Sequence, residues 1–182
     1  SIKLSTSIKS INEYTFSNCF ELERIDILYP LKTIPNNFFS SCIGLKNFSI
    51  PPSVTLIEKC AFGSCKSLTN IELSSSLTTI EDYAFDECKS LVEITIPSSV
   101  TSIGYSDFSR CMSLKQITIL STNISLGEFV FSECSALEQF TFPSCVTSIE
   151  RWMFNKCKSL EQITIPYSVT SIGENAFCDC ES

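Results

Sequence analysis

The chain has 182 residues, 43% of them hydrophobic, and a formal net charge of −7. This composition is typical of a folded chain, and the length fits one domain or one repeat array. The charge argues against nucleic acid and anionic lipid as partners, because both are bound through clustered Lys and Arg. No apolar run approaches the ~18 residues that span a bilayer, so no membrane insertion of this segment is expected.

Catalytic chemistry is poorly supported by the residues present. Histidine, the commonest general base and metal ligand, is absent from the sequence. There is no glycine-rich phosphate loop and no Cys-x-x-Cys pair, and the acidic pairs at 81–82 and 86–87 fit solvated turns. We therefore expect no enzyme activity, no metal site and no cofactor.

The chain begins with a partial repeat over residues 1–18, in which Ile2 and Leu4 resemble the end of a strand. Seven full units of 23 residues follow, opened by Cys19 and closed by Cys180. We expect a single repeat array over residues 1–182, as a fragment of a longer chain. Repeat arrays need polar capping units for solubility, and no such unit protects either end. End-to-end self-association or fraying of the ends is therefore expected.

The first half of each unit reads Leu-x-x-Ile-x-Ile, with close variants, as in Leu91, Ile94 and Ile96. The alternation of apolar and polar residues predicts a short strand. A proline often follows and would end the ladder, because it has no N–H to donate. The weakest unit is 114–134, where Leu120 replaces this proline; there we expect a repacked turn with Ile124 pointing inward.

The second half of each unit has helical spacing over about two turns, as in Ile80, Ala84, Phe85 and Cys88. A short α or 3₁₀ segment is predicted there.

One cysteine per unit would stack into a column, and a phenylalanine stands three residues before each one. These cysteines are Cys19, Cys42, Cys65, Cys88, Cys111, Cys134, Cys157 and Cys180. We interpret them as buried thiols that pack as small hydrophobic groups. Disulfides between neighbours remain an alternative, since adjacent rungs would lie about 5 Å apart.

The segments Leu-x-x-Ile-x-Ile-Pro, Val-Thr-Ser-Ile-Gly and Ala-Phe-x-x-Cys resemble the leucine-rich repeats of BspA-like (Treponema pallidum-type) surface proteins, and the match covers the whole chain. The resemblance implies a leucine-rich repeat solenoid of about eight 23-residue repeats. In it a parallel β-sheet forms the concave face, and short 3₁₀ or α turns and loops lie on the convex side. A parallel β-helix is the structural competitor.

The same resemblance implies a non-enzymatic protein-binding or adhesion module of a surface or secreted protein, whose partner is a host or matrix protein. Two alternatives stay open. The chain would otherwise be a cytoplasmic scaffold for protein–protein interaction, which a reduced cysteine column would suit, or an architectural spacer.

Partner contacts are most readily placed on outward strand positions, which are varied and charged in the N-terminal half. The candidate residues of this stripe are Arg24, Asp26, Asn70, Glu72 and Glu93. In the C-terminal half the same positions repeat Gln and Thr, which fit a wet sheet surface.

An aromatic patch is a second candidate. The position five before the cysteine is aromatic in several units, and Phe129 and Trp152 stand there in adjacent units. Trp is a frequent interface anchor. The alternative is that these rings cover the local turn. Asn47 and Asn123 begin Asn-x-Ser patterns, which would accept glycan on a eukaryotic secretory route.

Overall fold

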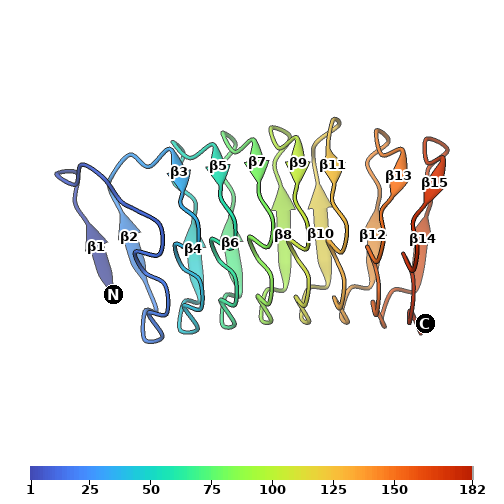
Figure 1. Ribbon diagram of the computed structural model, residues 1–182, viewed down its shortest axis with the longest axis horizontal. Helices are drawn as coiled ribbons and strands as arrows, with labels where there is room; N and C mark the ends of the chain where they lie inside the picture. The colour runs from blue at the N-terminus through green and yellow to red at the C-terminus, as the bar shows by residue number, and fades with distance from the viewer. Residues whose placement is uncertain (182) are drawn as a thin grey trace.

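The Leu-x-x-Ile-x-Ile segments form short parallel strands along one side of the molecule, as predicted. The computed structural model describes residues 1–181, and its units stand side by side in one row (Figure 1). Paired strands are in register, each residue opposite its equivalent one unit later, as Ile94 is opposite Ile117. These strands are β1 (Ile2–Leu4), β2 (Ile25–Ile27), β4 (Asn47–Ser49), β6 (Asn70–Glu72), β8 (Glu93–Ile96), β10 (Gln116–Ile119), β12 (Gln139–Thr141) and β14 (Gln162–Thr164).

A second, two-residue strand follows the turn in each unit. These strands are β3 (Thr33–Ile34), β5 (Leu56–Ile57), β7 (Thr79–Ile80), β9 (Ser102–Ile103), β11 (Ser125–Leu126), β13 (Ser148–Ile149) and β15 (Ser171–Ile172). The first five form one parallel sheet, whereas β13 and β15 pair separately. The break falls after the unit in which Leu120 stands at the proline position. There Ile124 is 7% exposed and Leu120 is 54% exposed, so the predicted inward placement of Ile124 is confirmed.

The second half of each unit consists of consecutive turns, and no helix is found in residues 1–181. Successive backbone N–H groups alternate between two kinds of acceptor. One donates within its unit, as Ala61 does to the Glu58 carbonyl at 3.2 Å, and the next donates to the following unit, as Phe62 does to the Ala84 carbonyl at 2.8 Å. Residues five and one before each cysteine have positive φ, for example 61° at Tyr83 and 58° at Glu87. The predicted short α or 3₁₀ segment is therefore replaced by consecutive turns, because left-handed residues interrupt the chain before a helix can form.

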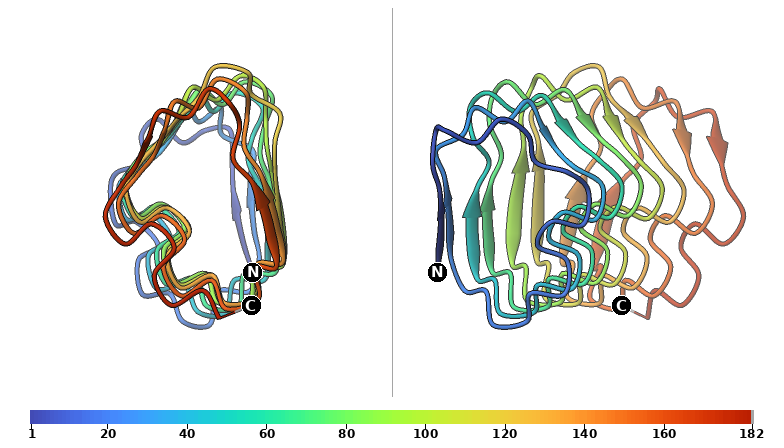
Figure 2. Two further views of the ribbon diagram at one scale, coloured as in Figure 1. Left: turned by 90° about the vertical axis from the view of Figure 1, so that its right-hand side faces the viewer. Right: turned by 60° about the vertical axis from the view of Figure 1, so that its left-hand side comes forward.

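Seen along the row, the units superimpose, with the long strands on one side and the stepped turns on the opposite side (Figure 2). We call these sides the strand face and the turn face. Between them lies a core of inward Leu, Ile, Val and Phe side chains together with the column cysteines. A continuous stack of rings runs through it, with Phe62, Phe85 and Phe108 at centroid spacings of 5.3 Å. Each unit needs its neighbours to bury its apolar side chains fully, which makes stability a property of the stack.

Candidate interaction surfaces

The strand face is lined by exposed polar side chains, because strand side chains alternate and the inward ones are committed to the core. Three shallow grooves run along it. The N-terminal groove is lined by Arg24, Asp26, Asn70 and Glu72 among others. The middle groove brings together Asn70, Glu72 and Glu93. The C-terminal groove is lined by Glu93 and by the following glutamine and threonine positions.

The five candidate residues of the stripe do not all line one groove, since Glu93 is absent from the N-terminal one. Arg24 and Asp26 form an ion pair with each other, their closest atoms 3.1 Å apart, so their charges largely cancel. Asn70, Glu72 and Glu93 meet in the middle groove. Glu72 accepts a hydrogen bond from the Ser49 hydroxyl at 3.1 Å. The two halves of the stripe are thus chemically distinct.

The C-terminal half of the strand face carries the stacked Gln and Thr rows that the sequence indicated. Gln139 is opposite Gln162, and Thr141 is opposite Thr164, in the pair of strands β12 and β14. All four side chains are exposed. Rows of identical polar side chains stabilise a sheet through cross-strand contacts, so this half needs no ligand to account for its composition.

The aromatic candidates lie on the turn face and belong to a longer row. Phe129 and Trp152 are stacked, with ring centroids 5.9 Å apart and planes 7° apart. Tyr105 contacts Phe129 at 5.2 Å and Tyr83 at 5.3 Å, which extends the row over four units. Tyr105 was missed in the sequence because it stands six residues before its cysteine, not five. The rings contact one another along the row, stacked between Phe129 and Trp152 and tilted at the other two contacts.

The column cysteines share one environment. Each thiol from Cys42 to Cys180 donates to the phenylalanine carbonyl of the preceding unit, as Cys65 Sγ does to the Phe39 carbonyl at 3.1 Å. All eleven cysteines are free in this structure. Burial raises the pKa of Cys42 to about 12 and the pKa of Cys88 well above its usual range. These thiols are therefore poor nucleophiles, since the thiolate is the reactive form.

A thiol titration without reductant checks this environment. We expect all eleven thiols to react in denaturant, but only the partly exposed ones to react quickly in the native protein. The six buried thiols, Cys42, Cys65, Cys88, Cys111, Cys134 and Cys157, should react only as the chain unfolds. Fewer than eleven thiols in denaturant would instead indicate disulfides between neighbouring units.

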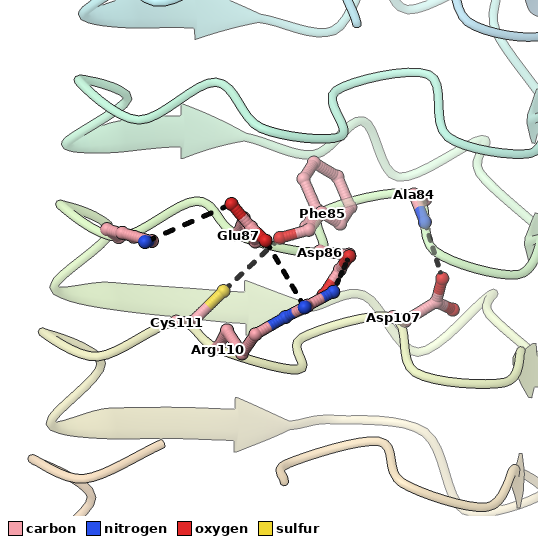
Figure 3. Close-up of polar contacts among 8 residues, drawn as sticks. Ala84, Phe85, Asp86, Glu87, Asp107, Arg110 and Cys111 are labelled. Atoms are coloured by element: carbon pink, nitrogen blue, oxygen red, sulfur yellow. Dashed lines mark hydrogen bonds and ion pairs between the residues drawn. The ribbon is translucent and has the colours of Figure 1, made fainter. Parts of the chain in front are cut away.

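Asp107 is a buried carboxylic acid that the sequence reasoning did not single out. It is 0% exposed and stands at a position where neighbouring units have Ala or another apolar residue. One carboxyl oxygen accepts a hydrogen bond from the backbone N–H group of Ala84 at 2.8 Å (Figure 3). The other accepts one from the backbone N–H group of Gly104 at 2.6 Å. Burial raises the pKa of Asp107 well above its usual range, and these two bonds oppose the shift. The only sequence signal was an acid at an apolar position.

Arg110, by contrast, neutralises the acidic turn beside it. Its guanidinium is 2.6 Å from Asp86 and 3.2 Å from Glu87 (Figure 3). The acidic pair at 86–87 thus belongs to an ion-pair network on the turn face. Within residues 1–181 no group of three or more Cys, Asp or Glu side chains is arranged to hold a metal ion, and no helix there is long and apolar enough to cross a membrane.

The two Asn-x-Ser patterns lie on different surfaces. Asn47 is exposed in β4 on the strand face, and Asn123 is exposed in the turn before β11. A glycan on Asn47 would cover part of the N-terminal groove, which Asn47 helps to line. Glycosylation of either residue stays a prediction.

Comparison with known proteins identifies the repeat. No curated protein matches the chain. Among solved structures, a T. pallidum leucine-rich repeat protein is 32% identical with a TM-score of 0.80, covering 87% of this chain and 74% of that one. A leucine-rich repeat protein from Eubacterium ventriosum is 24% identical, TM-score 0.70, covering 97% of this chain and 57% of that one. A leucine-rich cell surface protein from Faecalibacterium prausnitzii is 24% identical with a TM-score of 0.57, covering 98% of this chain and 67% of that one.

The match to a family model agrees with the fold and repeat described above. The model of the BspA type leucine-rich repeat region matches in 6 copies, over residues 1–89 and 55–182. Repeat spacing, parallel strand register and the T. pallidum structure all agree with it. The chain belongs to the BspA-type leucine-rich repeat family.

Proposed function

We propose that this chain is a non-catalytic module of a surface or secreted protein and that it binds a protein partner through the strand face. The observation that carries the proposal is the contrast between the two sides of each strand. Inward positions repeat Leu, Ile and Phe, whereas outward positions change from Arg24 and Asp26 to Asn70, Glu72 and Glu93 along the row. A constant core that carries a varied, exposed and polar face is the arrangement of a recognition surface.

The family and its relatives support this proposal at a coarser level. Leucine-rich repeats are protein-interaction folds, and the similar solved structures are leucine-rich repeat proteins too. One of them is a cell surface protein, which favours surface display and adhesion to a host or matrix protein over a cytoplasmic scaffold. End-to-end self-association stays a prediction.

A steric block of the strand face tests the proposal. We expect the chain to bind at least one member of a panel of purified extracellular matrix proteins on a biosensor. Thr95→Tyr should abolish that binding, because Thr95 is exposed in the middle groove and a ring there would hold a partner away. Thr147→Tyr places the same ring at an exposed turn position outside the three grooves and should bind as the parent does.

The opposite result would favour one of the alternatives. Binding that survives Thr95→Tyr would contradict a strand-face site, and failure to bind any matrix protein would favour the scaffold or the spacer. Labelling of intact producing cells with a membrane-impermeant biotin reagent separates surface display from a cytoplasmic location.

A further inference from the structure

Among the carboxylates that line the three grooves of the strand face, two form no ion pair within residues 1–181. Five carboxylates line the three grooves. Glu23 faces Lys46 at 3.9 Å, Asp26 faces Arg24 at 3.1 Å, and Glu138 faces Lys115 at 3.3 Å. Within residues 1–181, Glu72 and Glu93 form no such ion pair. The sheet therefore presents its unneutralised negative charge at one place, the middle groove.

The middle groove also offers apolar surface next to that charge. Neither Lys nor Arg lines it, and its wall includes Leu73, Pro97 and Leu120. Leu120 is 54% exposed. It stands where four other units have proline, and its backbone N–H bonds to the Ile96 carbonyl at 3.0 Å, which fixes the residue beside the groove. An exposed leucine beside two carboxylates that form no ion pair matches a ligand with an apolar stem and a cationic head.

We propose that the middle groove receives a lysine or arginine side chain from a protein partner. The aliphatic stem packs against Leu120 and Leu73, and the ammonium or guanidinium group meets the carboxylates of Glu72 and Glu93. Such complementarity on an exposed sheet sets orientation and association rate more than raw affinity. The inference rests on the proposed function, because it assigns a partner chemistry to the same face.

A labelled oligolysine peptide serves as the probe, titrated against the intact chain by fluorescence anisotropy at low ionic strength. The double variant Glu72→Gln/Glu93→Gln should bind it about three- to tenfold more weakly, the range for two exposed ion pairs. The matched control Glu23→Gln/Glu138→Gln removes the same formal charge from the same face but from carboxylates that already have a cation. It should change the affinity less than twofold.

Leu120→Ser distinguishes specific binding in the middle groove from long-range electrostatic attraction, because it leaves every charge in place. We expect it to weaken peptide binding measurably as the stem loses its apolar contact. Three results would overturn the inference: no binding of oligolysine, equal losses in the two double variants, or an unchanged affinity in Leu120→Ser.

The same variants keep this inference distinct from the proposed function. With a matrix protein as ligand, one result would be loss of binding in Thr95→Tyr but not in Glu72→Gln/Glu93→Gln. That result would support the strand-face site and contradict the insertion of a basic side chain into the middle groove. Binding that persists in Thr95→Tyr would contradict the proposed strand-face site itself.

Discussion

Truncating the central ring, Phe85→Ala, should destabilise the chain by about 3–5 kcal/mol, the range for removing a large buried aromatic side chain. Phe85 is 0% exposed and stacks on Phe62 and Phe108, both at 5.3 Å. The change leaves a cavity that opens onto both adjacent units. Because a stacked array is stabilised by contacts between nearest neighbours, the loss should also divide cooperative unfolding into two transitions.

Chemical denaturation followed by circular dichroism measures both effects. The matched control is Phe20→Ala, since Phe20 is the same residue type but 51% exposed. It should cost well under 1 kcal/mol, as surface substitutions usually do. If Phe85→Ala cost no more than Phe20→Ala, the ring stack would not be a source of stability.

The parts of the fold that the sequence predicted are those that every unit repeats. Column positions such as Phe85 and Cys88 each have one packing role, and their spacing determines the strand register without any long-range information. The inward placement of Ile124 was also predictable. Asn123 stands where other units have a buried valine, and burying it there would leave its amide without hydrogen-bond partners. Because every unit repeats the pattern, the strand register can be predicted from residue spacing along the chain alone.

The turn segments and the single deviations were harder to predict. The spacing of Ile80, Ala84 and Phe85 fits a helix and a series of turns equally well, and only the positive φ at Tyr83 and Glu87 distinguishes them. The sequence placed Glu72 and Glu93 on one face, but it did not indicate which charges on that face are paired. Pairing depends on the directions of long side chains, as in Lys46 toward Glu23, and a repeat pattern does not encode these.

Asp107→Ala should stabilise the protein at neutral pH, by about 1–3 kcal/mol, the range for a buried polar group whose hydrogen bonds compensate only part of its desolvation. Alanine is the residue of other units at this position, so it fits the core. The two N–H groups that Asp107 accepts from keep main-chain acceptors, the Glu81 carbonyl for Ala84 at 3.3 Å and the Ile80 carbonyl for Gly104 at 3.1 Å. Thermal or urea denaturation at pH 7 measures the gain.

The pH dependence of that gain is the sharper test. Burial raises the folded pKa of Asp107, whereas the unfolded chain ionises near the usual value of about 3.9. The folded state therefore binds more protons than the unfolded state between these two pKa values, and the free energy of unfolding of the parent falls as pH rises through that window. The advantage of Asp107→Ala should be smallest below about pH 3.9 and should grow toward neutral pH.

Asp107→Asn separates ionisation from hydrogen bonding. It should remove the same pH-dependent difference, because an amide does not titrate. It should nevertheless be less stable than Asp107→Ala, since its oxygen can accept from one of the two N–H groups while its NH₂ is left facing the other donor. The exposed variant Glu174→Gln, at a side chain 69% exposed, controls for loss of a surface carboxylate. An advantage of Asp107→Ala that stays constant from acid to neutral pH would show that Asp107 does not titrate between the folded and unfolded states.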